Sequence, residues 1–484
     1  MFHQEVKIVS RLQRFTQSRA GLVALWCSLA MPLVAHAAPA GEKTAPALLL
    51  SMAGVSETVV KEPIFHGQVH VYTAGRRDAP TVVLVHGIGD KGARDWEGLT
   101  ATLAQDFHVV SFDLPGFGRS SKGNQPYTPE NYVAILRHLV VRQGWTQPFF
   151  LVGHSMGGAI ALRYAARYPH DVTALVLVDV TGILHRLAYS RFLTHLGIDF
   201  LPSLYRAQND HLSNLAGSIL SLVERARPAP EVILASATLR QSFLRGEPSR
   251  ISGLALALEN FSDDIARVQA PTLVLWGGRD ELAPLRNGRV LSANLPQAQL
   301  EVFEASGHTP MDDVPESFTR RVAAFLHAPV LDRRNTVLHR ELVWPASTRT
   351  ASCNQRRDMI FEGDYDRISI ERCRNIQLRD VRVRELRITN AAVSIEDSWI
   401  GGANGGLIVD DARVSITSSV IEGRTAITAI AAHLDIAGSR IVGSESALVA
   451  PRQSEILFSV SRVQSPHFRG SLHELRIVAP GNPL

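Results

Sequence analysis

The sequence lacks a surplus of charge of either sign. Its 50 lysine and arginine residues nearly balance 46 aspartate and glutamate residues, for a net charge of +4. Lysine is scarce, and we interpret the excess of arginine as compositional bias rather than as a binding surface. Residues 1–37 carry +3 of the net charge, so the rest of the chain carries only +1. This balance gives no electrostatic basis for binding nucleic acid or an anionic membrane.

The composition also excludes a disordered chain. Apolar residues make up 45% of the sequence and charged residues 20%, as in soluble globular proteins. The 484 residues are too many for one ordinary core. At roughly 150 residues per domain, we expect two or three domains.

The N-terminus has the three parts of a secretory signal peptide. Basic residues come first, an apolar stretch covers Ala20–Val34, and residues 35–37 form a small-x-small cleavage site. We therefore expect a signal peptide at 1–37, a linker at 38–54 and a periplasmic or secreted protein. The alternative is an uncleaved membrane anchor, because the apolar stretch is nearly long enough to span a bilayer.

Cysteine is rare, with three in the chain. Cys27 follows Trp26, where lipid attachment needs a small residue, so we do not expect a lipoprotein. Cleavage would leave Cys353 and Cys373, an even number in an exported chain, and we expect them to form a disulfide. Two unpaired thiols are the alternative.

Short apolar runs alternate with helical stretches from Val55 to about Ala328. Several runs are apolar throughout, which is typical of parallel strands covered on both faces. The pattern predicts an open α/β sheet, in which ligands bind beyond the carboxyl ends of the strands. The expected strands are Gln68–Tyr72, Thr81–Val85, His108–Phe112, Phe149–Val152, Leu175–Val178, Thr272–Leu275 and Leu300–Phe303.

The fourth of these strands runs into Gly-His-Ser-Met-Gly at residues 153–157, a G-x-S-x-G pattern followed by a good helix former. In a strand–turn–helix context this pattern predicts a strained serine whose hydroxyl stands above the sheet edge. The free N–H groups of the helix would favour an oxyanion beside Ser155. The alternative is an ordinary Gly-Ser loop.

Other strand ends carry turn-rich segments with polar side chains, including 86–89, 113–120, 276–280 and 304–310. With these motifs in place, residues 55–328 resemble the α/β-hydrolase superfamily. That family places its nucleophile, acid and histidine in the chain order that Ser155, Asp280 and His308 have here.

The resemblance implies roles for these residues. His308 would act as the base for Ser155, and Asp280 would orient the imidazole and stabilise its charged form. The N–H groups of Ile88 and Met156 would bind the oxyanion. No cofactor and no metal ion are expected.

Several polar residues have a competing interpretation. Asp179 also follows a strand, at a position where some relatives carry the acid, and it is the alternative to Asp280. We expect Asp113 to cap the turn after its strand. Structural roles are expected for three histidines, namely His86, His154 and His170.

The serine narrows the reaction, because relatives that dehalogenate alkanes or open epoxides use aspartate at this position. Relatives that hydrolyse carbon–carbon bonds resemble the chain around Gly89 and Trp96. They carry asparagine shortly after the tryptophan, where this chain has Glu97-Gly98. We therefore expect a carboxylic ester hydrolase acting on small-molecule or acylated esters. Carbon–carbon hydrolysis is the alternative, and amide hydrolysis and perhydrolysis remain open.

An apolar segment at about 182–266 has helical patterns. By resemblance it is a helical cap over the serine that lines the acyl or alcohol pocket.

The last third of the chain contains an internal repeat at 393–400, 414–421, 434–441 and 456–463. The spacing of 20–22 residues predicts that residues 350–484, after a linker at 329–349, form a right-handed parallel β-helix. Cysteines 20 residues apart would then stack near the strand spacing of ~4.8 Å, within disulfide reach.

This β-helix is expected either to contact glycans or to serve as a stabilising or docking appendix. A non-catalytic protein that binds glycans or partners through it is the rival to an enzyme. The sequence leaves the oligomeric state open.

Overall fold

A computed structural model describes residues 54–145, 147–189, 229–330, 337–338, 349–402 and 405–484. The expected signal peptide, most of both linkers and part of the expected cap lie outside these residues. Among the described residues, no helix combines the length and the apolar character needed to cross a membrane.

An eight-stranded sheet organises residues 56–303, with the order β1-β2-β4-β3-β5-β6-β7-β8. Neighbours from β4 onward pair in parallel, whereas β2 pairs antiparallel to both β1 and β4. This confirms the expected α/β fold. The strands are β1 (Ser56–Lys61), β2 (Gln68–Ala74), β3 (Thr81–Val85), β4 (His108–Phe112), β5 (Phe149–His154), β6 (Val172–Val178), β7 (Thr272–Gly277) and β8 (Ala298–Phe303).

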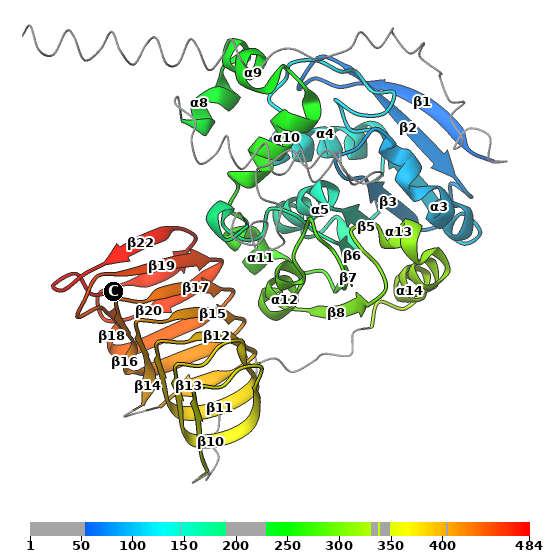
Figure 1. Cartoon of the computed structure of the whole chain (residues 1–484). Coiled ribbons are helices and arrows are strands. Elements are labelled where there is room, and N and C mark those ends of the chain that lie inside the picture. Colours follow the sequence, from blue (N-terminus) through cyan, green and yellow to red (C-terminus); the bar gives the residue numbers. More distant parts are fainter. Residues whose placement is uncertain (1–53, 146, 190–228, 331–336, 339–348, 403–404) are drawn as a thin grey trace, which may run out of the picture. The chain divides into compact units, whose positions relative to one another are not determined.

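Helices cover both faces of this sheet (Figure 1). On β3, Val83 and Val85 belong to a core shared with α4 and α5, while Val82 and Leu84 belong to a second core shared with α3 and α14. The apolar strands are therefore buried on both sides, as their composition predicts. The helices are η1 (Gly92–Trp96), α3 (Glu97–Leu103), α4 (Pro129–Arg142), α5 (Met156–Arg167), α11 (Ser262–Arg267), α12 (Leu285–Asn294), α13 (Pro310–Asp313) and α14 (Pro315–His327).

The described part of the expected cap is helical. It consists of α8 (Pro230–Ala235), α9 (Ala237–Leu244) and α10 (Pro248–Ala257), which precede α11. Ser252 of α10 lies 3.3 Å from the Tyr132 hydroxyl of α4, so α10 packs on the α/β core. Residues 190–228 of the expected cap lie outside the described residues.

Residues 350–478 form a parallel β-solenoid. Equivalent residues of successive repeats pair in register, as in the series Val393, Val414, Leu434 and Ile456. Buried isoleucine side chains fill the interior, and the last strands fold back antiparallel over the final coil. The strands are β9 (Thr350–Asn354), β10 (Ile360–Glu371), β11 (Ile376–Thr389), β12 (Ala392–Glu396), β13 (Trp399–Gly401), β14 (Gly406–Asp410), β15 (Arg413–Thr417), β16 (Val420–Ile430), β17 (His433–Ala437), β18 (Arg440–Val449), β19 (Ser454–Ser459), β20 (Ser461–Gln464), β21 (Arg469–Leu472) and β22 (Leu475–Val478).

Each predicted eight-residue repeat strand is broken into two strands by a corner. The corner residue has a positive φ, between 44° and 56°, in all four repeats: Asp397, Ser418, Gly438 and Val460. A buried serine follows each corner residue: Ser398, Ser419, Ser439 and Ser461. Apolar residues occupy the first, third and eighth positions of all four repeats, so the two-residue alternation breaks at the corner.

These serines form a ladder inside the solenoid. The backbone N–H of Ser398 donates to Ser419 Oγ at 3.1 Å, that of Ser419 to Ser439 Oγ at 3.1 Å, and that of Ser439 to Ser461 Oγ at 3.3 Å. Each hydroxyl in turn donates to the carbonyl two residues before it. The ladder thus satisfies buried backbone groups where the strand ladder is interrupted.

The structure contains the Cys353–Cys373 disulfide, with Cα atoms 6.5 Å apart. The expected stacking of the two cysteines one strand spacing apart is wrong. Cys353 pairs with Ile370 of β10, and Cys373 lies beyond the end of that strand. The offset between β9 and β10 is 17 residues rather than 20, so the bond joins a strand to the turn after its neighbour.

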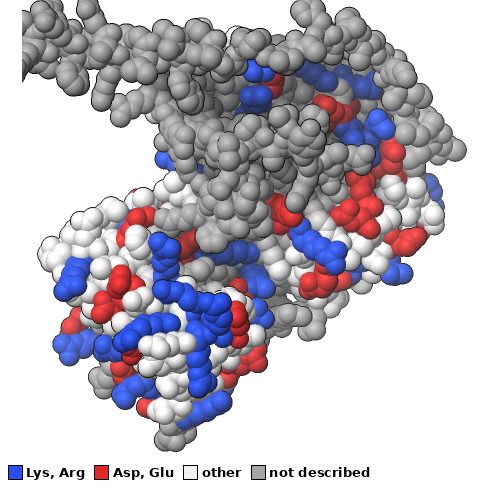
Figure 2. Space-filling view, in the orientation of Figure 1, with Lys and Arg blue, Asp and Glu red and all other residues white. Residues whose placement is uncertain are grey.

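Basic and acidic side chains are interspersed on the visible face of the solenoid (Figure 2). Arg382 makes a bidentate ion pair with Asp364 of the preceding coil, at 2.6 and 2.7 Å. Arg367 and Glu385 pair between the same two coils, at 3.1 Å. These arginines are therefore neutralised within the solenoid.

Polar contacts join α12 to the solenoid. Arg286 donates to Thr417 Oγ1 at 2.7 Å and to the carbonyl of Asp435 at 3.0 Å, and it pairs with the Asp435 carboxylate at 2.9 Å. Asn294 donates to the carbonyl of Gly438 at 3.0 Å. Leu457 of the solenoid belongs to the same apolar core as α12.

Candidate active site

Ser155 occupies the turn between β5 and α5 with φ 53° and ψ −120°, a conformation that costs free energy for a residue with a side chain. Close packing holds it there. A Cβ on Gly153 would lie 2.3 Å from the Gly157 carbonyl, and one on Gly157 would lie 2.2 Å from the Val85 carbonyl. The glycines of the pentapeptide are therefore required for this turn, as the G-x-S-x-G pattern predicts.

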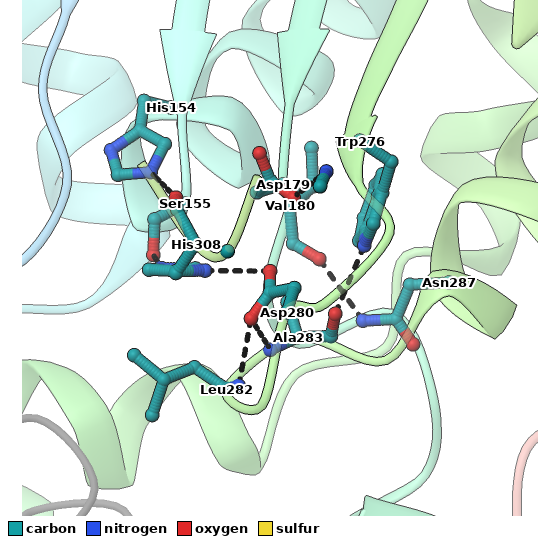
Figure 3. A network of polar contacts seen from close by, with 12 residues as sticks. His154, Ser155, Asp179, Val180, Trp276, Asp280, Leu282, Ala283, Asn287 and His308 are labelled. Atoms are coloured by element: carbon teal, nitrogen blue, oxygen red, sulfur yellow. Dashed lines mark hydrogen bonds and ion pairs between the residues drawn. The ribbon is translucent and has the colours of Figure 1, made fainter. Parts of the chain in front are cut away.

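Three side chains from separate loops form one hydrogen-bonded chain (Figure 3). His308 Nε2 lies 3.0 Å from Ser155 Oγ, and His308 Nδ1 lies 2.8 Å from Asp280 Oδ2. The loops follow β5, β7 and β8, so the chain lies beyond the carboxyl ends of the strands. The structure thus brings together the three residues named from the sequence.

Asp280 is held by its own loop as well as by His308. Its Oδ1 accepts from the backbone N–H of Leu282 at 2.7 Å and of Ala283 at 2.9 Å. Trp276 Nε1 donates to the Ala283 carbonyl at 2.9 Å and fixes that loop. Burial tends to raise the pKa of Asp280, but His308 and the two backbone donors outweigh it and lower the pKa below the usual value.

His154 bonds to the backbone of the loop that carries His308. Its Nε2 donates to the His308 carbonyl at 2.7 Å, while its Nδ1 is buried without a partner among the described residues. Burial, and next the neighbouring His308, lower the pKa of His154 to about 3, so the ring is neutral. The structural role expected for His154 is confirmed, but its partner depends on tertiary packing that the sequence does not display.

Asp313 was not singled out in the sequence, although it supports the same loop. Its Oδ2 accepts from the Gly307 N–H at 2.8 Å and from the Ser306 hydroxyl at 3.0 Å. Asp313 lies six residues after Gly307, at the end of the short helix α13. Nothing else in the sequence indicated that it contacts this loop.

The loop after β3 is fixed against the nucleophile. The Leu114 N–H donates to His86 Nε2 at 2.9 Å, so His86 Nδ1 carries the proton and donates to the Gly87 carbonyl at 2.6 Å. A Cβ on Gly87 would lie 2.9 Å from Ser155 Cβ. His86 is thus structural, as expected, and it fixes Gly87, the residue before Ile88, against the serine.

Asp113 caps the turn after β4, as expected. Its carboxylate accepts from the backbone N–H of Ala93 and of Arg119, both at 2.8 Å, and from the Tyr72 hydroxyl at 3.0 Å. His170 is exposed in the turn between α5 and β6.

The two expected oxyanion donors have no backbone acceptor. Among the described residues, neither the N–H of Ile88 nor that of Met156 makes a hydrogen bond. Met156 begins α5, so its N–H points out of the helix N-terminus. Both donors are therefore free to bind an anionic oxygen.

Asp179, Asp280 and His308 are the one group of three potential metal ligands in the described ranges, with one polar atom of each within 4.8 Å of the others. Asp280 and His308 already bond to each other, and His308 bonds to Ser155. The arrangement therefore suits proton transfer between hydrogen-bonded groups better than the binding of a cation.

Comparison with known proteins agrees with this geometry. Residues 80–315 match the family described as alpha/beta hydrolase fold, and an uncharacterized protein of Mycobacterium tuberculosis is 30% identical over 277 residues. That alignment covers 53% of this chain and 79% of the mycobacterial protein. The chain belongs to the α/β-hydrolase fold family.

Relatives of this α/β-hydrolase include a lipase and a dienedioate hydrolase. Lipase 1 of Psychrobacter immobilis is 28% identical, over 50% of this chain and 76% of the lipase. A 2-hydroxy-6-oxononadienedioate/2-hydroxy-6-oxononatrienedioate hydrolase of Comamonas testosteroni is 26% identical, over 56% of this chain and 94% of that enzyme. The hydrolase domain is thus similar to enzymes that act on different substrates.

Proposed function

We propose that the protein is an exported serine hydrolase that cleaves carboxylic esters through an acyl-enzyme on Ser155. The hydrogen-bonded chain of Ser155, His308 and Asp280 at a strand–helix turn is the observation that carries this proposal. A serine hydroxyl is a weak nucleophile at neutral pH, and this chain supplies the base that it needs.

In the proposed mechanism, His308 Nε2 takes the proton of Ser155 Oγ as the oxygen attacks the ester carbonyl carbon. Asp280 keeps the other ring nitrogen protonated and stabilises the imidazolium. The oxyanion of the tetrahedral intermediate accepts hydrogen bonds from the N–H groups of Ile88 and Met156, each contributing about 3 kcal/mol. His308 then protonates the departing alcohol and activates the water that hydrolyses the acyl-enzyme.

The alternative reaction is carbon–carbon hydrolysis, which the similarity to the Comamonas enzyme keeps open. Relatives with that activity resemble the segment around Trp96 but carry an asparagine shortly after it. Here Glu97 begins α3, and its carboxylate pairs with Arg94 at 3.3 Å. This local difference favours the ester reaction, in line with the similarity to a lipase.

Turnover assays distinguish ester hydrolysis from carbon–carbon hydrolysis. Purified protein is tested on p-nitrophenyl esters of graded chain length and on a 2-hydroxy-6-oxo dienoate. We expect ester hydrolysis that fails in Ser155→Ala. Hydrolysis of the dienoate alone would establish the carbon–carbon reaction, and no turnover of either substrate by folded protein would favour a binding protein.

Export is tested separately by sequencing the N-terminus of material recovered from the periplasm or the medium. A mature chain that begins near Ala38 supports it. Retention of residues 1–37 in a membrane fraction indicates the anchored alternative.

A further inference from the structure

Asp179 is a second buried carboxyl beside the acid of the triad. It follows β6, next to β7, and is 0% exposed. Its φ is 44°, a conformation that a residue with a side chain adopts only when its surroundings hold it there. Its own N–H donates to the Leu275 carbonyl at 3.1 Å, and its Oδ1 accepts from the Gly277 N–H at 2.8 Å.

The other oxygen of Asp179 has no such partner. Oδ2 is buried and makes no hydrogen bond to any described residue. Asp179 nevertheless belongs, with Asp280 and His308, to the group of polar atoms that lie within 4.8 Å of one another. The strained backbone thus holds the Asp179 carboxyl group beside the triad (Figure 3).

Two carboxylates this close, and removed from water, do not both hold a negative charge at neutral pH. The hydrogen-bond donors decide which one does. Asp280 accepts from the N–H groups of Leu282 and Ala283 and bonds to His308 Nδ1, whereas Asp179 accepts from Gly277 alone in the part of the chain that the structure describes. The charge is therefore stable on Asp280, and the proton belongs on Asp179.

We propose that Asp179 is a neutral carboxylic acid whose Oδ2 proton is directed at Asp280, so that it acts as a positioning residue for the triad. The catalytic part of this inference rests on the proposed function. A proton on Oδ2 gives the unpartnered oxygen a donor role and leaves one negative charge on the carboxyl pair. The charge of Asp280 then remains available to His308.

The electrostatics of the site agree with this assignment. Burial, and next the charge of Asp280, raise the pKa of Asp179 well above its usual value, and Asp313 adds to the effect. The Gly277 N–H acts in the opposite direction. Further titratable side chains near this pair are His308, which bonds to Asp280, His154, which bonds to the carbonyl of His308, and Tyr189, whose pKa is raised by burial and next by the charge of Asp280.

Infrared spectroscopy tests the proton directly and needs no turnover. Ser155→Ala protein at about pH 7.5 should show the C=O band of a buried protonated carboxyl, because the native pKa of Asp179 is raised. The band should disappear in the Ser155→Ala, Asp179→Asn double variant and persist in Ser155→Ala, Asp113→Asn, which removes a buried but well-bonded carboxylate. Absence of the band in folded Ser155→Ala protein would overturn the proposal.

Kinetics test the positioning role. Asparagine supplies a neutral N–H donor and a carbonyl acceptor, so Asp179→Asn should keep kcat/KM within about threefold. Leucine of similar size supplies neither, and Asp179→Leu should lose roughly tenfold to a hundredfold. The acid limb of the pH profile should not move in Asp179→Asn, since no charge is removed. An ionised Asp179 would instead make Asp179→Asn as damaging as Asp179→Leu and shift that limb.

Stability gives a third readout. Because folding raises the pKa of Asp179, the unfolded chain releases this proton at a lower pH than the native state does, and native stability falls as pH rises through that interval. Asp179→Asn removes this loss, so its Tm should exceed that of the wild type near pH 7.5 and converge with it toward about pH 4. A lower Tm for Asp179→Asn at neutral pH would contradict a protonated Asp179.

The two proposals fail separately. If the wild type hydrolyses no ester but the infrared band and the Tm pattern appear, the proposed reaction is wrong and the protonated Asp179 stands. If ester turnover is present and the band is absent, the proposed reaction stands and the protonated Asp179 is wrong.

Discussion

The nucleophile turn is where single residues determine the site. Its glycines and its serine follow from local backbone requirements, and the resemblance to the α/β-hydrolase superfamily supplied the acid and the histidine. The tertiary contacts of the residues that support the triad, such as His154 and Asp179, were not predictable in this way. His154 bonds to a carbonyl 154 residues further along the chain, and the partnerless oxygen of Asp179 becomes visible only when β6 and β7 lie side by side.

The first prediction at this scale concerns acid stability. His154 is 4% exposed, and its pKa is lowered to about 3. As pH falls below about 6.5, this histidine becomes protonated in the unfolded chain but stays neutral in the native state, so native stability decreases. His473, whose pKa burial lowers to about 3, acts in the same direction. We expect Tm to fall between about pH 6.5 and 5, and to fall less in His154→Gln. An equal slope in this variant would contradict a buried neutral His154.

At the scale of elements, the repeat spacing predicted the solenoid because each coil must bury the same alternating positions. The corners were missed, although the shared apolar positions of the repeats, the first, third and eighth, break the two-residue alternation there. The serine that follows each corner was a usable sign, as it recurs at the sixth position of all four repeats. The strand before β2 was also missed, because β1 is largely exposed and carries no apolar alternation.

The second prediction tests the serine ladder. Ser419→Ala removes the acceptor of the buried Ser398 N–H and the donor to the Thr417 carbonyl. Leaving such groups unpaired should lower the free energy of unfolding by about 1–3 kcal/mol. Ser415→Ala, four residues earlier on β15 at a half-buried position, is the control and should change it by less than about 0.5 kcal/mol. Equal effects in chemical denaturation would show that the ladder carries no stability.

The third prediction tests the disulfide. The bond closes a loop of 20 residues and should stabilise the solenoid by about 3 kcal/mol, chiefly by restricting the unfolded chain. Intact-mass measurement with and without reductant should show the loss of two hydrogens in protein recovered from an oxidising compartment. Two free thiols in that material would contradict the bond.

At the scale of the whole molecule, the composition indicated more than one domain but not how they meet. Arg286 shows the reason, because its partners on β15 and β17 lie 131 and 149 residues away in the chain. Two roles are proposed for the solenoid, namely contact with glycans and support of the hydrolase domain. The contacts on α12, five residues after Asp280, favour support.

The fourth prediction follows from these contacts. A truncation after Pro329 retains every triad motif and should hydrolyse small esters, but with a lower Tm, because Arg286 loses its partners and the apolar surface against Leu457 is exposed. Arg286→Ala in the full chain should reproduce part of that loss. If the truncated enzyme loses activity on acylated polysaccharide but keeps it on p-nitrophenyl esters, the solenoid also binds substrate. An inactive truncation would make the solenoid part of the catalytic structure.

The central claim is that Ser155 is acylated with His308 as its base, and mass spectrometry during turnover of a p-nitrophenyl ester tests it most directly. We predict an acyl adduct on the peptide that carries Ser155, no adduct and no turnover in folded Ser155→Ala, and a rate loss in His308→Ala nearly as large as that in Ser155→Ala. Asp280→Asn should lose less. An unchanged kcat in folded Ser155→Ala, or an adduct on another residue, would contradict the account.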